Sequence, residues 1–280
     1  MKLKDLAGMF NRSWEYAFSI RKFLFMFLTL VIVGLIFLFF QAIAPYSTPW
    51  LQFAFRFAPF FISAALLMVV GTLLIKTYIQ EKEEGPSLMT GAAFKSSFFS
   101  SSQPILMASY SALALLGAFL GFWILLGLFI LLKSIPYLGV FFGVILAFVP
   151  FLLNLAILLL LVAVLGALFF FTPVLAIKTR IERNDLTGRL RSDLFTHIVT
   201  LATAFIPVWI FWLFVRKAAQ MTFEVYSTGD NQVVMVLQAF FMLIPFAAAM
   251  AFPLIYFFNF ALESFQLLAP PQNNSTQDPQ

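Results

Sequence analysis

The amino-acid sequence predicts an all-α protein, a polytopic membrane helix bundle with six transmembrane helices. Of its 280 residues, 62% are hydrophobic and only 10% are charged, and the mean hydropathy is +0.98. In soluble domains roughly half of the residues are apolar, so water cannot be the solvent for most of this surface. The apolar residues also form six long runs between polar stretches. Runs of this length are typical of helices, which satisfy their own backbone hydrogen bonds in lipid.

The first three spans are predicted at residues 23–44, 57–75 and about 103–132. Residues 23–44 carry no charge, and as a helix they measure about 33 Å, which is enough to cross the hydrocarbon core. This apolar run is too long for a cleaved signal peptide, so we interpret it as a retained anchor. Arg56 and Lys76 bound the second span.

The fourth apolar run, residues 137–177, is too long for one perpendicular crossing. Either Pro150 kinks a single helix, or it separates a short interfacial segment at 137–149 from a crossing at 151–177. Two crossings would need nearly the whole run and a polar turn, which the sequence lacks. One crossing is therefore predicted, followed by a fifth span at about 198–215 and a sixth at 233–262.

The distribution of lysine and arginine predicts the orientation of these spans. With six crossings, 13 of the 17 basic residues fall on one side and 4 fall on the other, namely Arg56, Lys133, Arg216 and Lys217. Cytoplasmic loops carry an excess of basic residues, so both termini are expected in the cytoplasm.

Short polar motifs recur along the chain and predict three similar units. IKTYIQ (75–80) follows the second span, and IKTRIE (177–182) follows the fourth. The segments LAGMFNRSWE (6–15), LMTGAAFKSS (88–97) and LTGRLRSDLF (186–195) precede the odd-numbered spans, and each pairs a basic residue with serine. We expect parallel repeats of an amphipathic cytoplasmic helix plus a two-span hairpin.

These units are expected at about 1–82, 83–183 and 184–268, within a single six-span domain over residues 1–268. The polar, Pro-rich residues 269–280 are expected to form a disordered cytoplasmic tail.

This pattern resembles a broad group of bacterial membrane proteins. The group includes the YciC-like family and the membrane domain attached to some glycerophosphodiester phosphodiesterases. The resemblance implies a six-helix domain in the bacterial inner (plasma) membrane. It implies no phosphodiesterase activity, because this sequence contains no soluble phosphodiesterase domain, and it supplies no catalytic residues.

The search for chemical motifs argues against an enzyme. The chain has no cysteine, which excludes disulfides and thiolate metal sites. It contains no HExxH, GxSxG or phosphate-binding glycine loop, so no catalytic residue, metal or cofactor is predicted. The net charge of +5 is dispersed, which argues against nucleic acid. His197 is interpreted as an interfacial hydrogen-bonding residue, with a proton carrier as the alternative, and EKEE (81–84) as a solvated loop.

Five polar residues are candidates for a site. Arg12, Lys95 and Arg191 are predicted to contact lipid phosphates or an acidic partner from the cytoplasmic interface. The simpler interpretation is that they anchor the helices by reaching the headgroups. Asn154 and Asn259 are candidates for an intramembrane polar site, and interhelical packing is the simpler interpretation.

Together these observations favour a non-enzymatic integral inner-membrane protein with a scaffold, assembly or lipid-organising role. The expected partners are membrane lipids with anionic headgroups, and a membrane-protein partner or a second copy of the chain. The alternative is a small-molecule or lipid transporter or channel with a site near Asn154 and Asn259, motivated by the repeats and the prolines within the spans.

Overall fold

The computed structural model describes residues 3–84, 102–133, 148–177, 194–226 and 232–268, together with positions 135, 139 and 144. Its helices are α1 (Leu3–Glu15), α2 (Ile20–Ile43), α3 (Pro49–Glu84), α5 (Ser102–Lys133), α7 (Phe148–Ile177), α9 (Leu194–Tyr226) and α10 (Gln232–Leu268). The short 3-10 turns η1 (Tyr16–Phe18) and η2 (Ala44–Tyr46) follow α1 and α2. The predicted all-α bundle is confirmed.

Six of these helices, all except α1, are long and apolar enough to cross a bilayer. The protein is therefore an integral, multi-pass membrane protein. Several helices extend well past the predicted spans, since α3 continues beyond residue 75 to Glu84 and α9 beyond residue 215 to Tyr226. Hydropathy marks only the segment suited to hydrocarbon, whereas a helix keeps its backbone hydrogen bonds as it enters the headgroup layer.

The fourth apolar run contains one crossing helix, as predicted, but without a kink at Pro150. Helix α7 begins at Phe148, which places Pro150 in the first turn. The missing N–H of proline disrupts no intrahelical bond at that position. Most of residues 134–147 lie outside the described residues.

The EKEE run is not a loop, so its interpretation as a solvated loop was wrong. Residues 81–84 form the last turn of α3, and Glu81 is only 7% exposed. Its charge is buried because a basic residue of α2 faces it, an interaction that no local sequence pattern reports.

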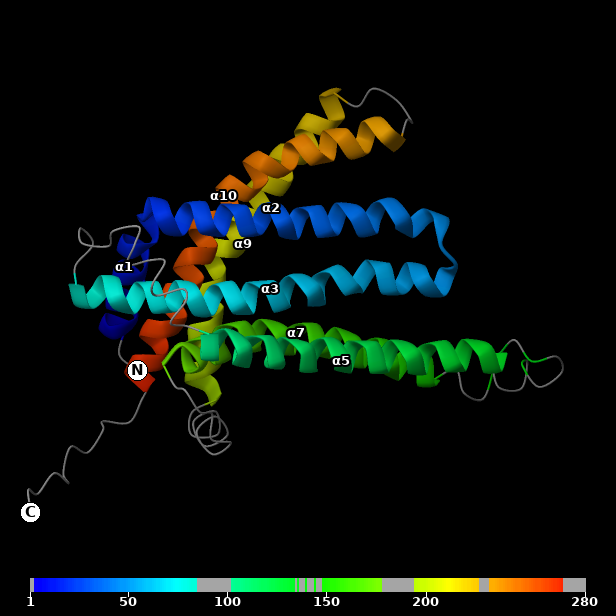
Figure 1. Ribbon diagram of the computed structural model, residues 1–280, viewed down its shortest axis with the longest axis horizontal. Coiled ribbons are helices and arrows are strands. Elements are labelled where there is room, and N and C mark those ends of the chain that lie inside the picture. Colours follow the sequence, from blue (N-terminus) through cyan, green and yellow to red (C-terminus); the bar gives the residue numbers. More distant parts are fainter. Residues whose placement is uncertain are drawn as a thin grey trace, which may run out of the picture.

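The helices form three hairpins, α2–α3, α5–α7 and α9–α10 (Figure 1). The first two hairpins run alongside each other, with the C-terminal ends of α2 and α5 at one end of the bundle and with α1 and the end of α10 at the opposite end. The α9–α10 hairpin crosses this arrangement obliquely, so that the C-terminal end of α9 and the beginning of α10 diverge from α2. Helix α3 contacts α2, α5, α7 and α10, and α10 contacts α1, α2, α3, α7 and α9, so these two helices connect the bundle.

The core lies where α3 and α10 meet their neighbours. Of the apolar stretch of α3, 61% is buried, against 28% or less in each of the other spans. Glycines allow close approach at two contacts, because a methyl group added at Gly71 would overlap Phe258 and one at Gly34 would overlap Leu243. Small residues serve this purpose in membrane bundles, where packing replaces the hydrophobic effect between helices.

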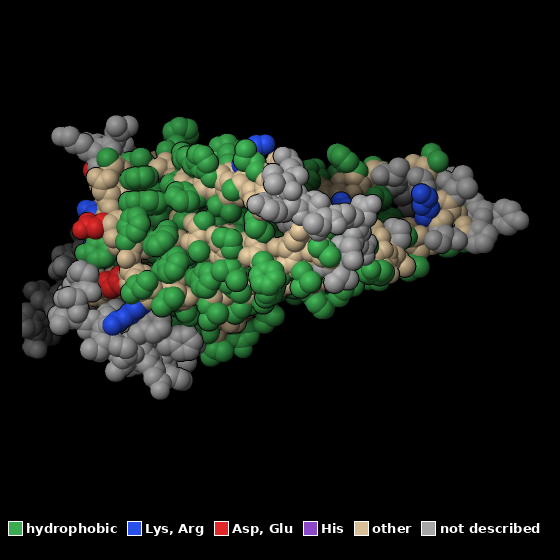
Figure 2. Space-filling model, turned by 90° about the horizontal axis from the view of Figure 1, so that it is seen from above, with side chains coloured by type: hydrophobic (Ala, Val, Ile, Leu, Met, Phe, Trp, Pro, Cys, Tyr) green, Lys and Arg blue, Asp and Glu red, His purple; other side chains and the backbone are tan. Residues whose placement is uncertain are grey.

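The outer surface is suited to lipid. Figure 2 shows hydrophobic side chains covering most of one face, with the visible acidic side chains gathered at one end. Exposed large hydrophobic side chains occur on all six apolar helices. In water such a surface would aggregate, whereas in a bilayer it meets acyl chains.

The structure tests the predicted threefold repeat only in part. The C-terminal ends of α3, which contains the first IKT motif, and of α7, which ends at Ile177, the first residue of the second motif, lie at the same end of the bundle (Figure 1). Helix α1 precedes the first hairpin, but its expected counterparts at 88–97 and 186–195 lie almost wholly outside the described residues. The threefold repeat therefore stays a prediction.

Candidate functional site

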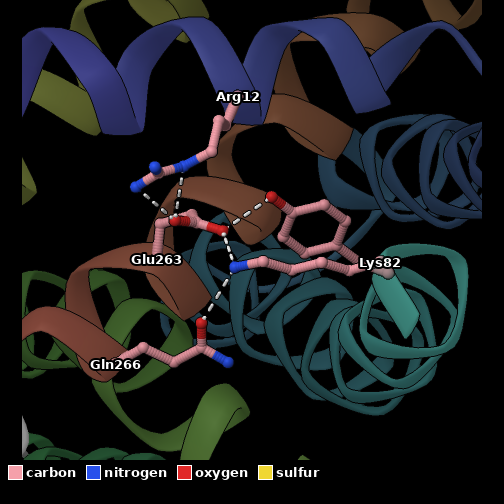
Figure 3. A network of polar contacts seen from close by, with 5 residues as sticks. Arg12, Lys82, Glu263 and Gln266 are labelled. Carbon is pink, nitrogen blue, oxygen red and sulfur yellow. Dashed lines mark hydrogen bonds and ion pairs between the residues drawn. The ribbon is translucent and has the colours of Figure 1, made fainter.

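A buried carboxylate, Glu263 of α10, lies at the centre of a polar network that joins three helices (Figure 3). Arg12 of α1 approaches one carboxylate oxygen, with Nη2 at 3.0 Å and Nε at 3.1 Å. The other oxygen accepts hydrogen bonds from the Tyr78 hydroxyl and from Lys82 Nζ, both at 2.8 Å. Lys82 also donates to Gln266 Oε1 at 3.2 Å. Four donor atoms thus surround one carboxylate.

The helical spacing of these residues explains how they meet. Tyr78 and Lys82 are four residues apart on α3, so both side chains project from one face toward α10. Glu263 is 3% exposed, while the side chains of Arg12 and Lys82 are 51% and 40% exposed. The cations therefore remain partly hydrated, and only the carboxylate is fully desolvated. The cost of burying that carboxylate is offset by its charged donors.

A second ion pair, Lys22 with Glu81, joins α2 to α3 beside this network. Lys22 Nζ lies 2.5 Å from Glu81 Oε2, and Lys22 is completely buried. The same ammonium donates to the backbone oxygen of Tyr16 at 2.8 Å and lies 5.2 Å from the centre of the Tyr78 ring. Because Tyr78 contacts both Lys22 and Glu263, it connects the two charged groups.

Helix α1 is held against α10 by further contacts. Asn259 is completely buried and donates from Nδ2 to the backbone oxygen of Ser13 at 3.2 Å. The rings of Phe10 and Trp14 each lie 5.3 Å from the Tyr256 ring in edge-on geometry. These contacts, with the Arg12–Glu263 pair, fix the N-terminal helix on the bundle. The network is suited to joining helices, because every charge named here is paired within it.

The structure separates the predicted site residues. Arg12 belongs to the Glu263 network, whereas Lys95 and Arg191 lie outside the described residues. Asn259 packs against α1, and Asn154 lines a cavity of about 440 Å³ with Thr48 and Trp50.

Trp50 and Tyr78 mark the two ends of α3, 28 residues or about 42 Å apart along that helix. Asn154 lies near the Trp50 end, and Asn259 lies one helical turn from Glu263, which contacts Tyr78. The two asparagines therefore do not form one site.

Sequence reasoning missed the residues that carry the charged network, namely Glu263, Glu81 and Lys22. The one available signal was spacing, since Asn259 and Glu263 lie four residues apart near the end of the last span. That spacing places two polar groups on one face of a helix, but it does not identify their partners more than 180 residues away.

An apolar groove of about 820 Å³ lies between α2 and the α9–α10 hairpin. Its lining comes from residues within 30–38 of α2, 212–219 of α9 and 239–249 of α10, together with Phe60 of α3. This volume lies within the range of small-molecule sites.

Two cations accompany this groove on α9. The guanidinium of Arg216 lies 5.1 Å from the centre of the Trp212 ring, and Trp212 lines the groove. Lys217 follows, with Nζ donating to Gln220 Oε1 over 3.4 Å. Both cations lie near the C-terminal end of the candidate span Phe195–Thr222 of α9.

Comparison of the chain with family models, curated proteins and solved structures found no match. The resemblance to the six-span bacterial group therefore stays a prediction from the sequence pattern.

Proposed function

We propose that this protein is a non-enzymatic integral membrane protein with a lipid-organising role. In this proposal it lies in a bacterial inner membrane with both termini in the cytoplasm, and the groove between α2 and the α9–α10 hairpin holds a lipid acyl chain. The observation that carries the proposal is the groove itself, which has a volume of about 820 Å³ and an apolar lining drawn from four helices.

The character of the lining favours an acyl chain over a polar solute. The residues that line the groove are leucine, valine, phenylalanine, tryptophan, methionine, proline, alanine and glycine, none of which has a charged side chain. A polar solute would lose hydration there without gaining hydrogen bonds. An acyl chain has no polar group to desolvate, and its packing contacts with the side chains of the groove can offset the chain entropy that it loses on leaving the bilayer.

The charged network supports a structural part in the same role. Arg12, Lys82 and Glu263 tie α1 and α3 to α10, and α10 supplies one wall of the groove. The network can thus hold that wall in position from the other end of α10. This arrangement favours binding and support over catalysis, because each charged side chain of the network is paired with a residue of another helix.

The test is photocrosslinking with a phospholipid that carries a diazirine in its acyl chain. The purified full-length protein is reconstituted with this lipid, irradiated and digested, and the labelled peptides are identified by mass spectrometry. We expect the label to concentrate on residues 30–38, 212–219 and 239–249 relative to the other membrane-facing segments.

Matched variants make this test specific. Ala219→Trp and Ala239→Phe place bulk in the groove and are expected to lower labelling of its walls at least several-fold. Ala202→Trp adds the same bulk at an exposed position on α9 outside the groove and should leave labelling unchanged. Uniform labelling of all lipid-facing helices in the wild-type protein would reject the proposed function.

A further inference from the structure

We propose that the lipid held in the groove is an anionic glycerophospholipid whose phosphate is bound by Arg216 and Lys217 of α9. This inference rests on the proposed function and adds to it the chemical class of the ligand. It assigns a role to two cations that the Glu263 network, at the other end of the bundle, leaves unexplained.

The position of Arg216 connects the charge to the groove. Arg216 lies one helical turn after Trp212, and its guanidinium lies over the indole ring that lines the groove. The neighbouring residues Val215 and Ala218 also line it. A chain lying against these residues therefore brings its polar end within reach of the guanidinium.

The positive charges of Arg216 and Lys217 favour the binding of an anion. The three ion pairs of the described residues involve Arg12, Lys22 and Lys82, and none includes Arg216 or Lys217. The nearest acidic residue along α9 is Glu224, which lies about 11 Å of helical rise beyond Lys217. A planar guanidinium binds phosphate through two parallel N–H donors, and an adjacent ammonium adds a second positive charge.

The length of the groove along its helices favours a lipid over a transmembrane helix of a partner. The lining covers about 12 Å of rise along α2, 10 Å along α9 and 15 Å along α10. One leaflet contributes about 15 Å to the hydrocarbon core, whereas a crossing helix needs a surface of about 30 Å. The groove therefore matches the chain of a lipid from one leaflet.

The placement of the cations also predicts how the lipid is organised. Arg216 lies six residues before Thr222, the end of the candidate span, which is about 9 Å of rise inside it. A long cationic side chain this close to the end of a span can extend to the headgroup layer and meet a lipid phosphate there.

The test is native mass spectrometry of the full-length protein from nanodiscs that contain equal amounts of phosphatidylglycerol and phosphatidylcholine. We expect the wild-type protein to retain phosphatidylglycerol at least five-fold over phosphatidylcholine. Raising the salt concentration from 50 to 500 mM should reduce that preference, because phosphate contacts by exposed cations are screened. The salt series needs no variant, so it remains decisive if a variant fails to fold.

Substitutions then locate the preference. Arg216→Gln with Lys217→Gln should bring the ratio of the two lipids close to one while the number of bound lipids stays the same. Lys133→Gln, which removes an exposed cation at the end of α5, should change neither quantity. If the wild-type protein retains both lipids equally, the inference fails and the proposed function stands. If it retains neither lipid, and the diazirine label is uniform, both fail.

Discussion

Arg12 and Glu263 lie 251 positions apart in the chain, yet the Nη2 atom of Arg12 lies 3.0 Å from a carboxylate oxygen of Glu263. This contact closes the bundle by joining the first helix to the last. It also changes the interpretation of Arg12, whose position before the first span predicted a lipid contact. Half of the Arg12 side chain is still exposed, so contact with a headgroup is compatible with the ion pair.

Removal of the central carboxylate tests the charged network. Glu263→Gln keeps the size of the side chain but leaves Arg12 and Lys82 without their shared anion. We expect a loss of about 3 kcal/mol in the free energy of unfolding, near the lower end for breaking a buried pair, because both cations reach water. Arg12→Gln should cost less than about 1 kcal/mol, as for an exposed pair. Thermal unfolding in detergent measures the stability lost by each variant. Equal losses for Glu263→Gln and Arg12→Gln would contradict this prediction.

The fully buried pair of Lys22 and Glu81 predicts a different mutational pattern. Lys22→Met alone leaves the carboxylate of Glu81 buried without its cation, and we expect a loss of about 3–5 kcal/mol. The double variant Lys22→Met with Glu81→Leu removes both charges and should regain most of that stability. A double-mutant cycle on thermal unfolding measures the coupling. Additive losses would show that the two side chains act independently.

The contrast between these pairs and the spans shows what the sequence can predict. Each span was predictable because lipid imposes the same requirement on every residue of a helix, and about 20 apolar residues satisfy it. Glu81 and Glu263 were not predictable as buried groups, because their burial depends on cations brought together by the fold. The groove was also missed, since it arises from the angle of a hairpin rather than from any motif.

The separation of α3 and α10 depends on Gly71. A methyl group at this position would overlap the ring of Phe258, which is almost fully buried. Gly71→Ala is therefore expected to lower the free energy of unfolding by about 1–3 kcal/mol, and Phe258→Leu in the same chain should recover part of the loss. Gly117→Ala is the matched control, because no atom lies within 4 Å of its added methyl. Thermal unfolding of the four proteins would refute this account if the two alanine variants behaved alike.

The orientation predicted from basic residues is tested with reporter fusions. Alkaline phosphatase and a cytoplasmic fluorescent reporter are each fused after Glu84, at the end of α3, and after Thr179, just beyond α7. The excess of lysine and arginine near both points predicts strong fluorescence and weak phosphatase activity at each. Fusions after Tyr46, in the turn between α2 and α3, should give the reverse. Signals from opposite sides at Glu84 and Thr179 would overturn both the orientation and the repeat.

Single cysteines in this cysteine-free chain test the transporter alternative at Asn154 and Asn259. Asn154 is exposed in a cavity of about 440 Å³ near Trp50, so Asn154→Cys should react with a small aqueous maleimide. Asn259 is completely buried against Ser13, so Asn259→Cys should be protected until the protein is denatured. A continuous pathway through the bundle requires water at both positions. Rapid labelling of both cysteines would therefore support the transporter alternative. Labelling of Asn154→Cys alone would support two separate environments at opposite ends of α3.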